Sequence, residues 1–275
     1  MPESPEVEAL ARFLDVEASG REIRGVDVLE FRTVKTRATP PSTLVGRTIA
    51  GAARRGKHVE LRLDEGSLVV SLGRHGWVRW LVGGEPAPAA EAPPALAALE
   101  LSDAAALQVT DAGTWVSLGL FVVTDAAEVP AIAKLGPDPA DARFTPADFD
   151  RALGGRRKQV KAILQEQESL AGIGNAYSDE ILHLARLSPV AHAAALDEAE
   201  RERLFDATVI TVREAIDARI GIPIDQLKAA KVGAMRVHGR TGETCPVCGD
   251  TIRDFTFSGT SAQYCPTCQT GGVLL

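Results

Sequence analysis

The chain has 275 residues, of which 45% are hydrophobic and 24% are charged, and its formal net charge at pH 7 is −7. This length can bury a substantial core and favours two or three folded units over one. No apolar run reaches the length of a membrane span, and residues 1–20 are too acidic for a signal peptide, so we expect a soluble protein of the cytoplasm.

The first half of the chain predicts one helix followed by short strands. Ser4 is a suitable N-cap, Pro5 fits the first helical position, and apolar residues then recur at helical spacing through Leu14. The strands that we expect are 26–31, 59–63, 67–72, 77–82 and 115–123, separated by glycines and by a Pro/Ala-rich stretch over 84–94. This pattern predicts an antiparallel β-sandwich, flanked by the helix, over residues 1–130.

Helical periodicity dominates after a linker at 135–139. The expected helices are 149–153, 160–164, 176–187 and 198–220, within a helical domain that we place at 131–238. Between two of them, Gly172 and Gly174 precede Asn175 in a tight turn, and the next helix offers unpaired N–H groups to an anion. The same pattern is typical of an ordinary corner between helices. Lys161, on the preceding helix, can reach the same anion and favours a phosphate site.

Basic residues gather in three places despite the negative total charge. The clusters are Arg54, Arg55 and Lys57; Arg156, Arg157, Lys158 and Lys161; and Lys228, Lys231, Arg236, His238 and Arg240. Such clusters are more often solvated faces than binding sites. Three of them beside a metal-binding segment favour a nucleic acid partner.

All four cysteines lie near the end of the chain, in two C-x-x-C pairs separated by sixteen residues. They are Cys245, Cys248, Cys265 and Cys268. Each pair can present two thiolates to one tetrahedral ion, and the intervening segment is long enough for one β-hairpin. This spacing predicts a zinc ribbon over 239–275 with one structural Zn²⁺. Because no cysteine is left for a disulfide, the pattern also favours a reducing compartment.

Five motifs in this order resemble the formamidopyrimidine-DNA glycosylase and endonuclease VIII family. They are residues 1–8, 54–57, 135–139 and 171–180, and the terminal ribbon. Residues 5–8 are more similar to the formamidopyrimidine branch. The resemblance implies an α+β fold with a helix-two-turn-helix DNA-binding domain, and a bifunctional glycosylase and abasic-site lyase of base excision repair.

The resemblance also implies roles for individual residues. After removal of Met1, Pro2 would attack C1′ of a damaged nucleotide through its free amine, and β,δ-elimination would cut the strand. Glu3 would be the acid/base group and Glu6 would support the nucleophile, although carboxylates at a helix start also simply complement the macrodipole. Phosphates would be held by Lys57, and by Gly174, Asn175 and Lys161 at the glycine turn.

Three stretches depart from the family pattern. Thr260 stands where the family has an arginine at the tip of the zinc hairpin. Family members usually fill the gap left by an extruded base with a methionine and an arginine–phenylalanine pair, whereas the matching positions here are Arg74, and Gly113, Thr114 and Trp115. Arg74 or Trp115 could enter the base stack, although Trp115 in a strand is equally typical of a core. The segment 221–232, where the family often carries a lid over the damaged base, is short and not rich in glycine and serine.

These departures leave three hypotheses for function. The first is a bifunctional enzyme for oxidised bases of the formamidopyrimidine and 8-oxoguanine type. The second is the same machinery acting mainly on abasic sites, oxidised pyrimidines or bulky and cross-linked adducts. The third is a non-catalytic binder of damaged DNA. In each case we expect a monomer whose partner is damaged double-stranded DNA, associated with a bacterial nucleoid and not with a membrane.

Overall fold

The computed structural model describes residues 1–83, 92–257 and 260–275, which form two compact units. The first unit contains Met1–Pro2, Glu6–Ala133 and Ile220–Leu227. The second contains Glu3–Pro5, Lys134–Arg219 and Lys228–Leu275. Each unit is therefore built from segments that are far apart in the sequence. Among the described residues, no helix combines the length and apolar character that crossing a membrane requires.

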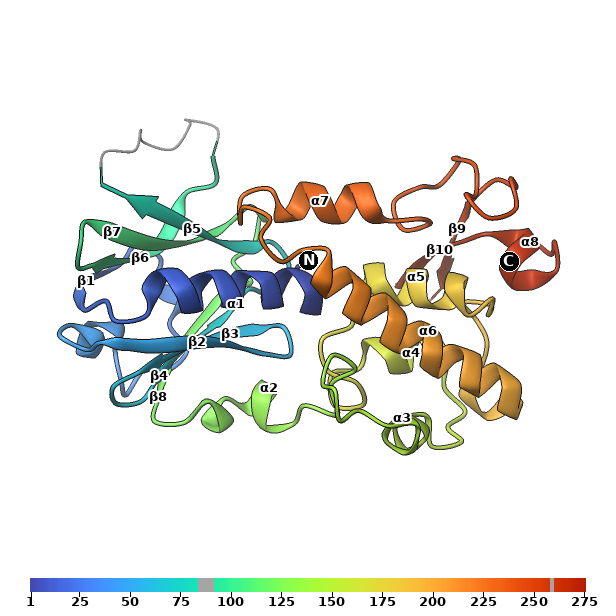
Figure 1. Cartoon of the computed structure of the whole chain (residues 1–275), viewed down its shortest axis with the longest axis horizontal. Helices are drawn as coiled ribbons and strands as arrows, with labels where there is room; N and C mark the ends of the chain where they lie inside the picture. Colours follow the sequence, from blue (N-terminus) through green and yellow to red (C-terminus); the bar gives the residue numbers. More distant parts are fainter. Residues whose placement is uncertain (84–91, 258–259) are drawn as a thin grey trace. The chain divides into compact units, whose positions relative to one another are not determined.

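Two four-stranded antiparallel sheets form the first unit (Figure 1). One sheet has the order β1-β6-β7-β5 and the other the order β2-β3-β4-β8. The strands are β1 Ile23–Val28, β2 Ile49–Arg55, β3 His58–Leu63, β4 Ser67–Ser71, β5 Gly76–Val82, β6 Ala95–Leu101, β7 Ala105–Asp111 and β8 Gly119–Val123. Inward residues of both sheets belong to one hydrophobic core, which confirms the expected sandwich.

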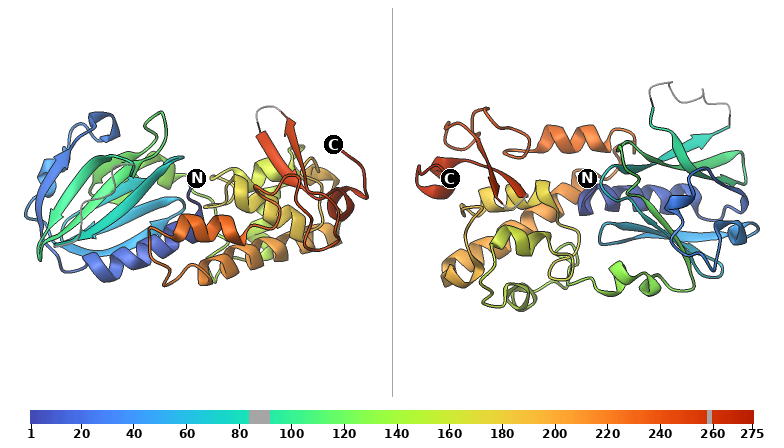
Figure 2. Two further views of the ribbon diagram at one scale, coloured as in Figure 1. Left: turned by 90° about the horizontal axis from the view of Figure 1, so that it is seen from above. Right: turned by 180° about the vertical axis from the view of Figure 1, so that it is seen from behind.

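Helix α1, Ser4–Ala18, lies along one edge of this sandwich (Figure 2). Its apolar residues Val7, Leu10, Leu14 and Ala18 recur every three or four positions and are all buried in the same core as the strands. The helix starts at Ser4, one residue before the first helical position expected at Pro5, and it places the chain's first residues at the end of a rigid element.

Several strand boundaries differ from the sequence expectation. Strand β1 begins at Ile23, and Phe31 lies beyond its end in the short 3₁₀ helix η1, Phe31–Thr33. The last strand of the sandwich begins at Gly119, so Trp115 lies outside it and the prediction of a strand over 115–123 was wrong at its start. The expected Pro/Ala-rich break at 84–94 falls largely on residues 84–91, outside the described residues.

The second unit contains the expected helices around a separate core. They are α3 Pro146–Leu153, α4 Val160–Gln165, α5 Asn175–Leu184 and α6 Glu198–Asp217. Capping boxes fix the starts of α3 and α6, at Thr145 with Asp148 and at Asp197 with Glu200. Helix α6 ends three residues earlier than expected, and α5 likewise ends at Leu184 instead of residue 187.

The chain ends in the expected hairpin. Strands β9 (Arg253–Phe257) and β10 (Thr260–Tyr264) pair antiparallel, and the short helix α8, Pro266–Thr270, follows. Figure 1 shows the hairpin beside α5, and the contacts between α5 and β10 agree. The remaining short helices are η2 Pro41–Leu44, η3 Ala126–Glu128, α2 Pro130–Ala133 and η4 Ala193–Ala195.

Helix α7, Leu227–Ala234, was not expected from the sequence. Ile224, before the helix, and Leu227, its first residue, pack into the core of the first unit, and the Trp77 indole N–H donates to the Ile224 carbonyl at 2.8 Å. The anchored helix α7 thus begins within the segment 221–232 and ends just beyond it at Ala234, and its Leu-Lys-Ala-Ala-Lys sequence has the propensity to form a helix.

Candidate active site and zinc centre

The carboxylate of Glu3 lies at the N-terminus of α5. The side chain is 1% exposed and accepts hydrogen bonds from the backbone N–H groups of Gly174, Ala176 (3.1 Å) and Tyr177 (3.4 Å). The ammonium of Lys231 approaches the same carboxylate at 3.1 Å. The dipole of α5 and this ammonium both stabilise negative charge on Glu3. Donors from two helices therefore hold one carboxylate in one orientation.

The glycine turn binds an anion that belongs to the protein itself, the carboxylate of Glu3. Gly174 is the N-cap of α5, and a Cβ built on it would lie only 2.7 Å from the Cδ of Glu3. A glycine is required there because the carboxylate approaches the backbone so closely. In this structure the N–H groups of the turn bind Glu3, while the side chain of Asn175 accepts from the Gln165 amide at 3.1 Å. The phosphate contact expected of Asn175 stays a prediction.

Lys161 lies beneath this turn, not on its surface. The residue is 3% exposed, and its ammonium pairs with Asp179 and donates to the Ser178 hydroxyl at 3.1 Å. Burial lowers the pKa of Lys161, and the charges of Asp179 and Glu3 oppose that shift. The structure brings Lys161 to the turn as expected from the sequence, but its charge is directed to a buried carboxylate.

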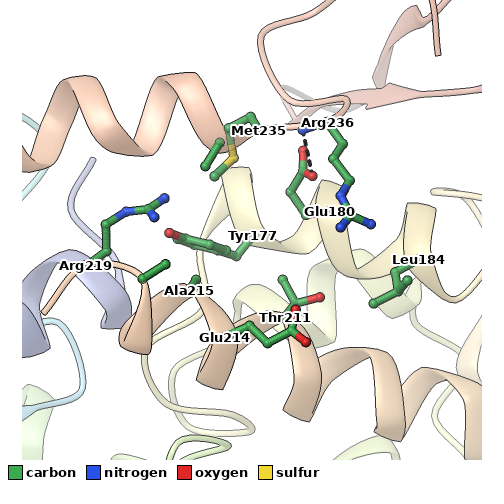
Figure 3. A pocket seen from close by; sticks show the side chains of 11 residues that line it. Tyr177, Glu180, Leu184, Thr211, Glu214, Ala215, Arg219, Met235 and Arg236 are labelled. Carbon is green, nitrogen blue, oxygen red and sulfur yellow. Dashed lines mark hydrogen bonds between the residues drawn. The ribbon is translucent and has the colours of Figure 1, made fainter. Parts of the chain in front are cut away.

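Lys231 extends from α7 to Glu3 with its ammonium over the ring of Tyr177. Its Nζ lies 4.8 Å from the centre of the Tyr177 ring, a cation–π distance. Tyr177 also lines a pocket of about 210 Å³, in which Arg219 and Met235 flank its ring (Figure 3). Figure 3 shows Tyr177 extending from α5 with its hydroxyl end toward Arg219 and with Met235 above its ring. The Glu3 carboxylate therefore lies close to a cation from α7 and to an aromatic ring from α5.

Two further carboxylates of α5 hold the segment that leads into the ribbon. Glu180 accepts the backbone N–H groups of Arg236, Val237 and His238, each at 2.9 Å. Asp179 accepts from the His238 ring at 2.7 Å in addition to Lys161. Because these carboxylates follow Gly174 on one helix, α5 connects the Glu3 site with the start of the ribbon.

The four cysteines form one metal site. Their Sγ atoms all lie within 4.8 Å of one another. One pair comes from the turn after Cys245, which precedes the hairpin in the sequence, and the other from the start of α8, which follows it. Burial raises the pKa of the Cys265 and Cys268 thiols, to about 11 for Cys268, so thiolates there require a bound cation. Four thiolates at this spacing fit tetrahedral Zn²⁺ with no open position, so the ion is structural.

The first unit places the other expected residues at separate points. Lys57 lies in the two-residue turn between β2 and β3, where Gly56 has a φ of +57°. Arg54, at the end of β2, pairs with Glu8 of α1 at 2.9 Å. Glu6 is buried on the first turn of α1. Arg54 is therefore held by an ion pair with the helix, whereas Lys57 is carried by the turn of a hairpin.

Arg74 and Trp115 lie on neighbouring loops. The Arg74 backbone N–H donates to the Ser117 hydroxyl at 2.9 Å, and Asp111 in turn accepts the N–H groups of Gly113 and Ser117. These bonds order the loop between β7 and β8, yet the Trp115 side chain is 81% exposed. The alternative that Trp115 belongs to the core is therefore wrong.

Three family models match the chain in succession. Residues 1–115 match the Formamidopyrimidine-DNA glycosylase N-terminal domain, residues 135–225 the Formamidopyrimidine-DNA glycosylase H2TH domain, and residues 242–271 the Zinc finger found in FPG and IleRS. The formamidopyrimidine-DNA glycosylase of Heliobacterium modesticaldum is 35% identical over 280 residues, covering 98% of this chain and 100% of that protein. The chain belongs to the formamidopyrimidine-DNA glycosylase family.

Other similar proteins agree with this assignment. A Mycobacterium tuberculosis protein, named an uncharacterized formamidopyrimidine-DNA glycosylase-like protein, is 44% identical over 149 residues, 54% of this chain and 93% of its own length. The Lactococcus lactis enzyme in complex with DNA containing FAPY-dG superposes with a TM-score of 0.86 at 28% identity, covering 98% of this chain and 100% of that one. The Thermus thermophilus protein gives a TM-score of 0.82 at 32% identity, with 98% of each chain covered.

Membership of the formamidopyrimidine-DNA glycosylase family confirms the expected fold and the structural zinc. Sequence reasoning missed the contacts that α7 and α5 make around Glu3 and the ribbon, namely those of Lys231, Tyr177 and Glu180. The sequence indicates Lys231 only as a member of a basic cluster. The helix propensity of residues 227–231 could have indicated α7, but nothing in the sequence indicates that a lysine so far from Glu3 packs against it.

Proposed function

We propose that the chain is a bifunctional DNA glycosylase and abasic-site lyase that removes oxidised bases in base excision repair. The observation that carries the proposal is the placement of Glu3, a buried carboxylate fixed by the N-terminus of α5 and directly following Pro2. The Heliobacterium modesticaldum relative carries this glycosylase name, and the Lactococcus lactis structures hold DNA with FAPY-dG or an abasic site.

The proposed chemistry starts at the nitrogen of Pro2. Once Met1 is removed, this nitrogen is a secondary amine that titrates near ~8, so a neutral fraction exists at neutral pH. It forms a bond to C1′ of the damaged nucleotide while the C1′–base bond breaks, and the proton lost from the nitrogen is taken up by the departing base. The C1′–O4′ bond then opens with a proton delivered to O4′, and the resulting iminium ion acidifies the hydrogen on C2′. Loss of that proton expels the 3′ phosphate, and a second elimination expels the 5′ phosphate.

Glu3 supplies proton transfer to and from the sugar in this scheme. Its carboxylate is held by backbone N–H groups, so it adopts one position without reorganisation when the nucleotide arrives. The neighbouring amine of Pro2 and the carboxylate are linked by one peptide unit, which places a nucleophile and a proton-transfer group next to each other.

DNA binding is proposed to use groups on both units. Lys57 at its turn and Asn175 at the start of α5 would contact phosphates flanking the lesion. Extrusion of the damaged nucleotide leaves a gap, and the exposed Trp115, on a loop bonded to that of Arg74, is a suitable side chain to fill it. The contacts need not be sequence-specific, which suits a repair enzyme that acts on damage wherever it occurs.

A second candidate keeps the machinery and changes the substrate. The segment 221–232 forms most of the anchored helix α7 in place of a glycine-rich lid, and Lys231 on this helix pairs with Glu3. This difference favours a lesion other than 8-oxoguanine, such as an oxidised pyrimidine, a bulky or cross-linked adduct, or an abasic site. A binder without turnover is disfavoured, because Pro2 and the fixed Glu3 would then have no use.

Borohydride trapping on abasic-site DNA tests the proposal. We expect a covalent protein–DNA product that disappears after selective acetylation of the N-terminus, whereas Pro2→Gly retains some trapping through its own amine. Absence of the product with the Met1-processed protein would contradict a lyase. A panel of duplexes with formamidopyrimidines, 8-oxoguanine, thymine glycol, dihydrouracil and an abasic site then identifies the preferred lesion.

Each of the three regions of the chain would have its own role in this function. The sandwich region 1–130 would carry the nucleophile, the helical region 131–238 the phosphate contacts, and the ribbon 239–275 a further DNA contact. Residues 258–259, which the resemblance places at the tip of the zinc hairpin, lie outside the described residues. We propose a monomer acting on the chromosome of a bacterial cell, since its named relatives are bacterial.

A further inference from the structure

Lys231 is a buried cation next to the carboxylate of Glu3. The residue is 9% exposed on α7, its Nζ lies 3.1 Å from the Oε1 of Glu3, and the same Nζ lies 4.8 Å from the Tyr177 ring centre. Burying an ammonium is costly unless charge and hydrogen bonds compensate for the lost water. Glu3 and Tyr177 both provide such compensation, and both belong to the site at the start of α5.

We propose that Lys231 is the positioning residue for Glu3, fixing the charge and the orientation of its carboxylate from α7. This inference rests on the proposed function and deepens it. Lys231 contacts Glu3, so its effect on base release passes through the carboxylate. The segment that the family uses as a lid thereby becomes, in this chain, part of the proton-transfer site.

The charges around Glu3 determine the sign of the effect. Lys231 faces it from α7, and Lys161 faces it from α4 within electrostatic range. The charge of Lys161 is offset by its ion pair with Asp179 of α5, which also accepts from His238. Lys231 is therefore the cation that we expect to dominate the electrostatic stabilisation of Glu3.

Two further cationic groups lie near this site. Once Met1 is removed, the Pro2 amine is one residue away in the chain, and Arg219 lines the pocket beside Tyr177. These groups would remain after a substitution at Lys231, so the variant removes only the charge that contacts Oε1 of Glu3 at 3.1 Å. Removing Lys231 should make the ionised carboxylate less stable, and Glu3 should take up its proton at a higher pH.

The test compares Lys231→Met with Lys231→Arg and with Lys228→Met, a neighbouring lysine that is exposed on the same helix. Methionine keeps the packing against Tyr177 and removes the charge, whereas arginine keeps the charge. The first measurement is the ¹³C NMR titration of glutamate-labelled protein, with the Glu3 carboxyl signal assigned by its loss in Glu3→Gln. We expect Lys231→Met to move this titration upward by about one pH unit or more, and the other two variants to leave it close to wild type.

The second measurement is single-turnover base release as a function of pH. In Lys231→Met we expect about a tenfold slower release at neutral pH and a shifted pH profile, with the affinity for abasic-site DNA nearly unchanged. Lys231→Arg should restore most of the rate. A merely structural role of Lys231 would lower stability in both substitutions without moving the Glu3 titration.

The outcomes separate this inference from the proposed function. If wild-type protein neither releases a base nor traps abasic-site DNA, the proposed function fails, and the NMR titration still reports whether Lys231 acts on Glu3. If the protein is active but Lys231→Met titrates and reacts like Lys228→Met, the positioning role is refuted. Borohydride trapping that persists after N-terminal acetylation and is lost in Lys231→Met would also overturn it, because Lys231 would then be a nucleophile.

Discussion

The imidazole Nε2 of His183 lies 3.4 Å from the Sγ of Cys245, so a side chain of α5 contacts a zinc ligand of the ribbon. Burial and the charges of Arg236 and Arg186 lower the pKa of His183, which favours a neutral ring. A ring N–H directed at the sulfur would stabilise the thiolate and orient it toward the metal. The zinc centre is therefore supported by the helix that also holds Glu3.

Replacing His183 with Phe should weaken zinc binding by about 10- to 100-fold, because the thiolate of Cys245 loses a hydrogen-bond donor while the volume of the ring is kept. Competition with a coloured chelator measures the affinity and the rate of zinc release. His192→Phe, at an exposed histidine of the same unit, is the matched control. Equal zinc release from the two variants would show that the contact does not support the metal.

The cysteines could be assigned from the sequence, whereas His183 could not. The spacing of a C-x-x-C pair is enough to predict a metal site, because two thiolates three residues apart on one turn can bind the same ion. His183 lies 62 residues from Cys245 and sits in an ordinary helical pattern, so its contact depends on how α5 packs against the ribbon. Local spacing carries no information about that packing.

Lys161→Met should destabilise the protein by about 3–5 kcal/mol, because Asp179 would stay buried after losing its ammonium partner and keep only the weaker support of the His238 ring. Urea unfolding measured at neutral pH gives the change in the free energy of unfolding. Lys158→Met is the control, since Lys158 pairs with Glu166 nearer the surface and its loss should cost less than about 1 kcal/mol.

The same variant distinguishes a structural lysine from a phosphate contact. A lysine that binds phosphate contributes to the salt dependence of DNA affinity, so its removal reduces the slope of log affinity against log salt by about 1. We expect the slope to be unchanged in Lys161→Met. A reduced slope with unchanged stability would instead support the phosphate contact inferred from the sequence.

Basic clusters show why the sequence alone overestimates a binding surface. Residues 156–161 look like one cationic patch, yet Arg156 and Lys158 both pair with Glu166, and Lys161 points into the core. The order of sheets and helices could be predicted, because hydrophobic periodicity records which face of each element is buried. Partners of individual charges could not, since an ion pair depends on the packing of distant segments.

Trp115→Ala should weaken binding to abasic-site DNA by about 1–3 kcal/mol while leaving thermal stability unchanged, if the indole stacks in the gap as proposed. Fluorescence anisotropy with an abasic-site duplex measures the affinity. Phe31→Ala is the matched control, because Phe31 is also an exposed aromatic residue of the first unit. Trp115→Phe should retain most of the affinity through its remaining ring.

Comparison with Arg74→Ala decides between the two candidates for the gap. Both residues lie on loops joined by the bond from the Arg74 N–H to Ser117, so either could reach the same place. A loss in Arg74→Ala that disappears at high salt indicates a phosphate contact. If Trp115→Ala binds as tightly as Phe31→Ala, stacking by this indole is excluded.

Glu166 should make the free energy of unfolding depend on pH in the acidic range. Hydrogen bonds from Arg156, Ser169 and Lys158 lower its pKa from 4.5 to about 2. Above about pH 4.5 the carboxyl is ionised in the folded and unfolded states and the stabilisation is complete. As the pH falls toward about 2 the unfolded chain takes up the proton first, so the stabilisation decreases.

Glu166→Gln removes this titration, so its unfolding free energy should change less than that of wild type between about pH 5.5 and about pH 3.5. Because the side chain is partly exposed, we expect the difference to be only about 0.5–1 kcal/mol and to shrink in high salt. Urea unfolding at the two pH values measures it. Glu168→Gln, which removes an exposed carboxylate that lies 3.7 Å from Lys134, should follow wild type. A Glu166→Gln protein that loses as much stability in acid as Glu168→Gln would mean that the pairs with Arg156 and Lys158 are not maintained in solution.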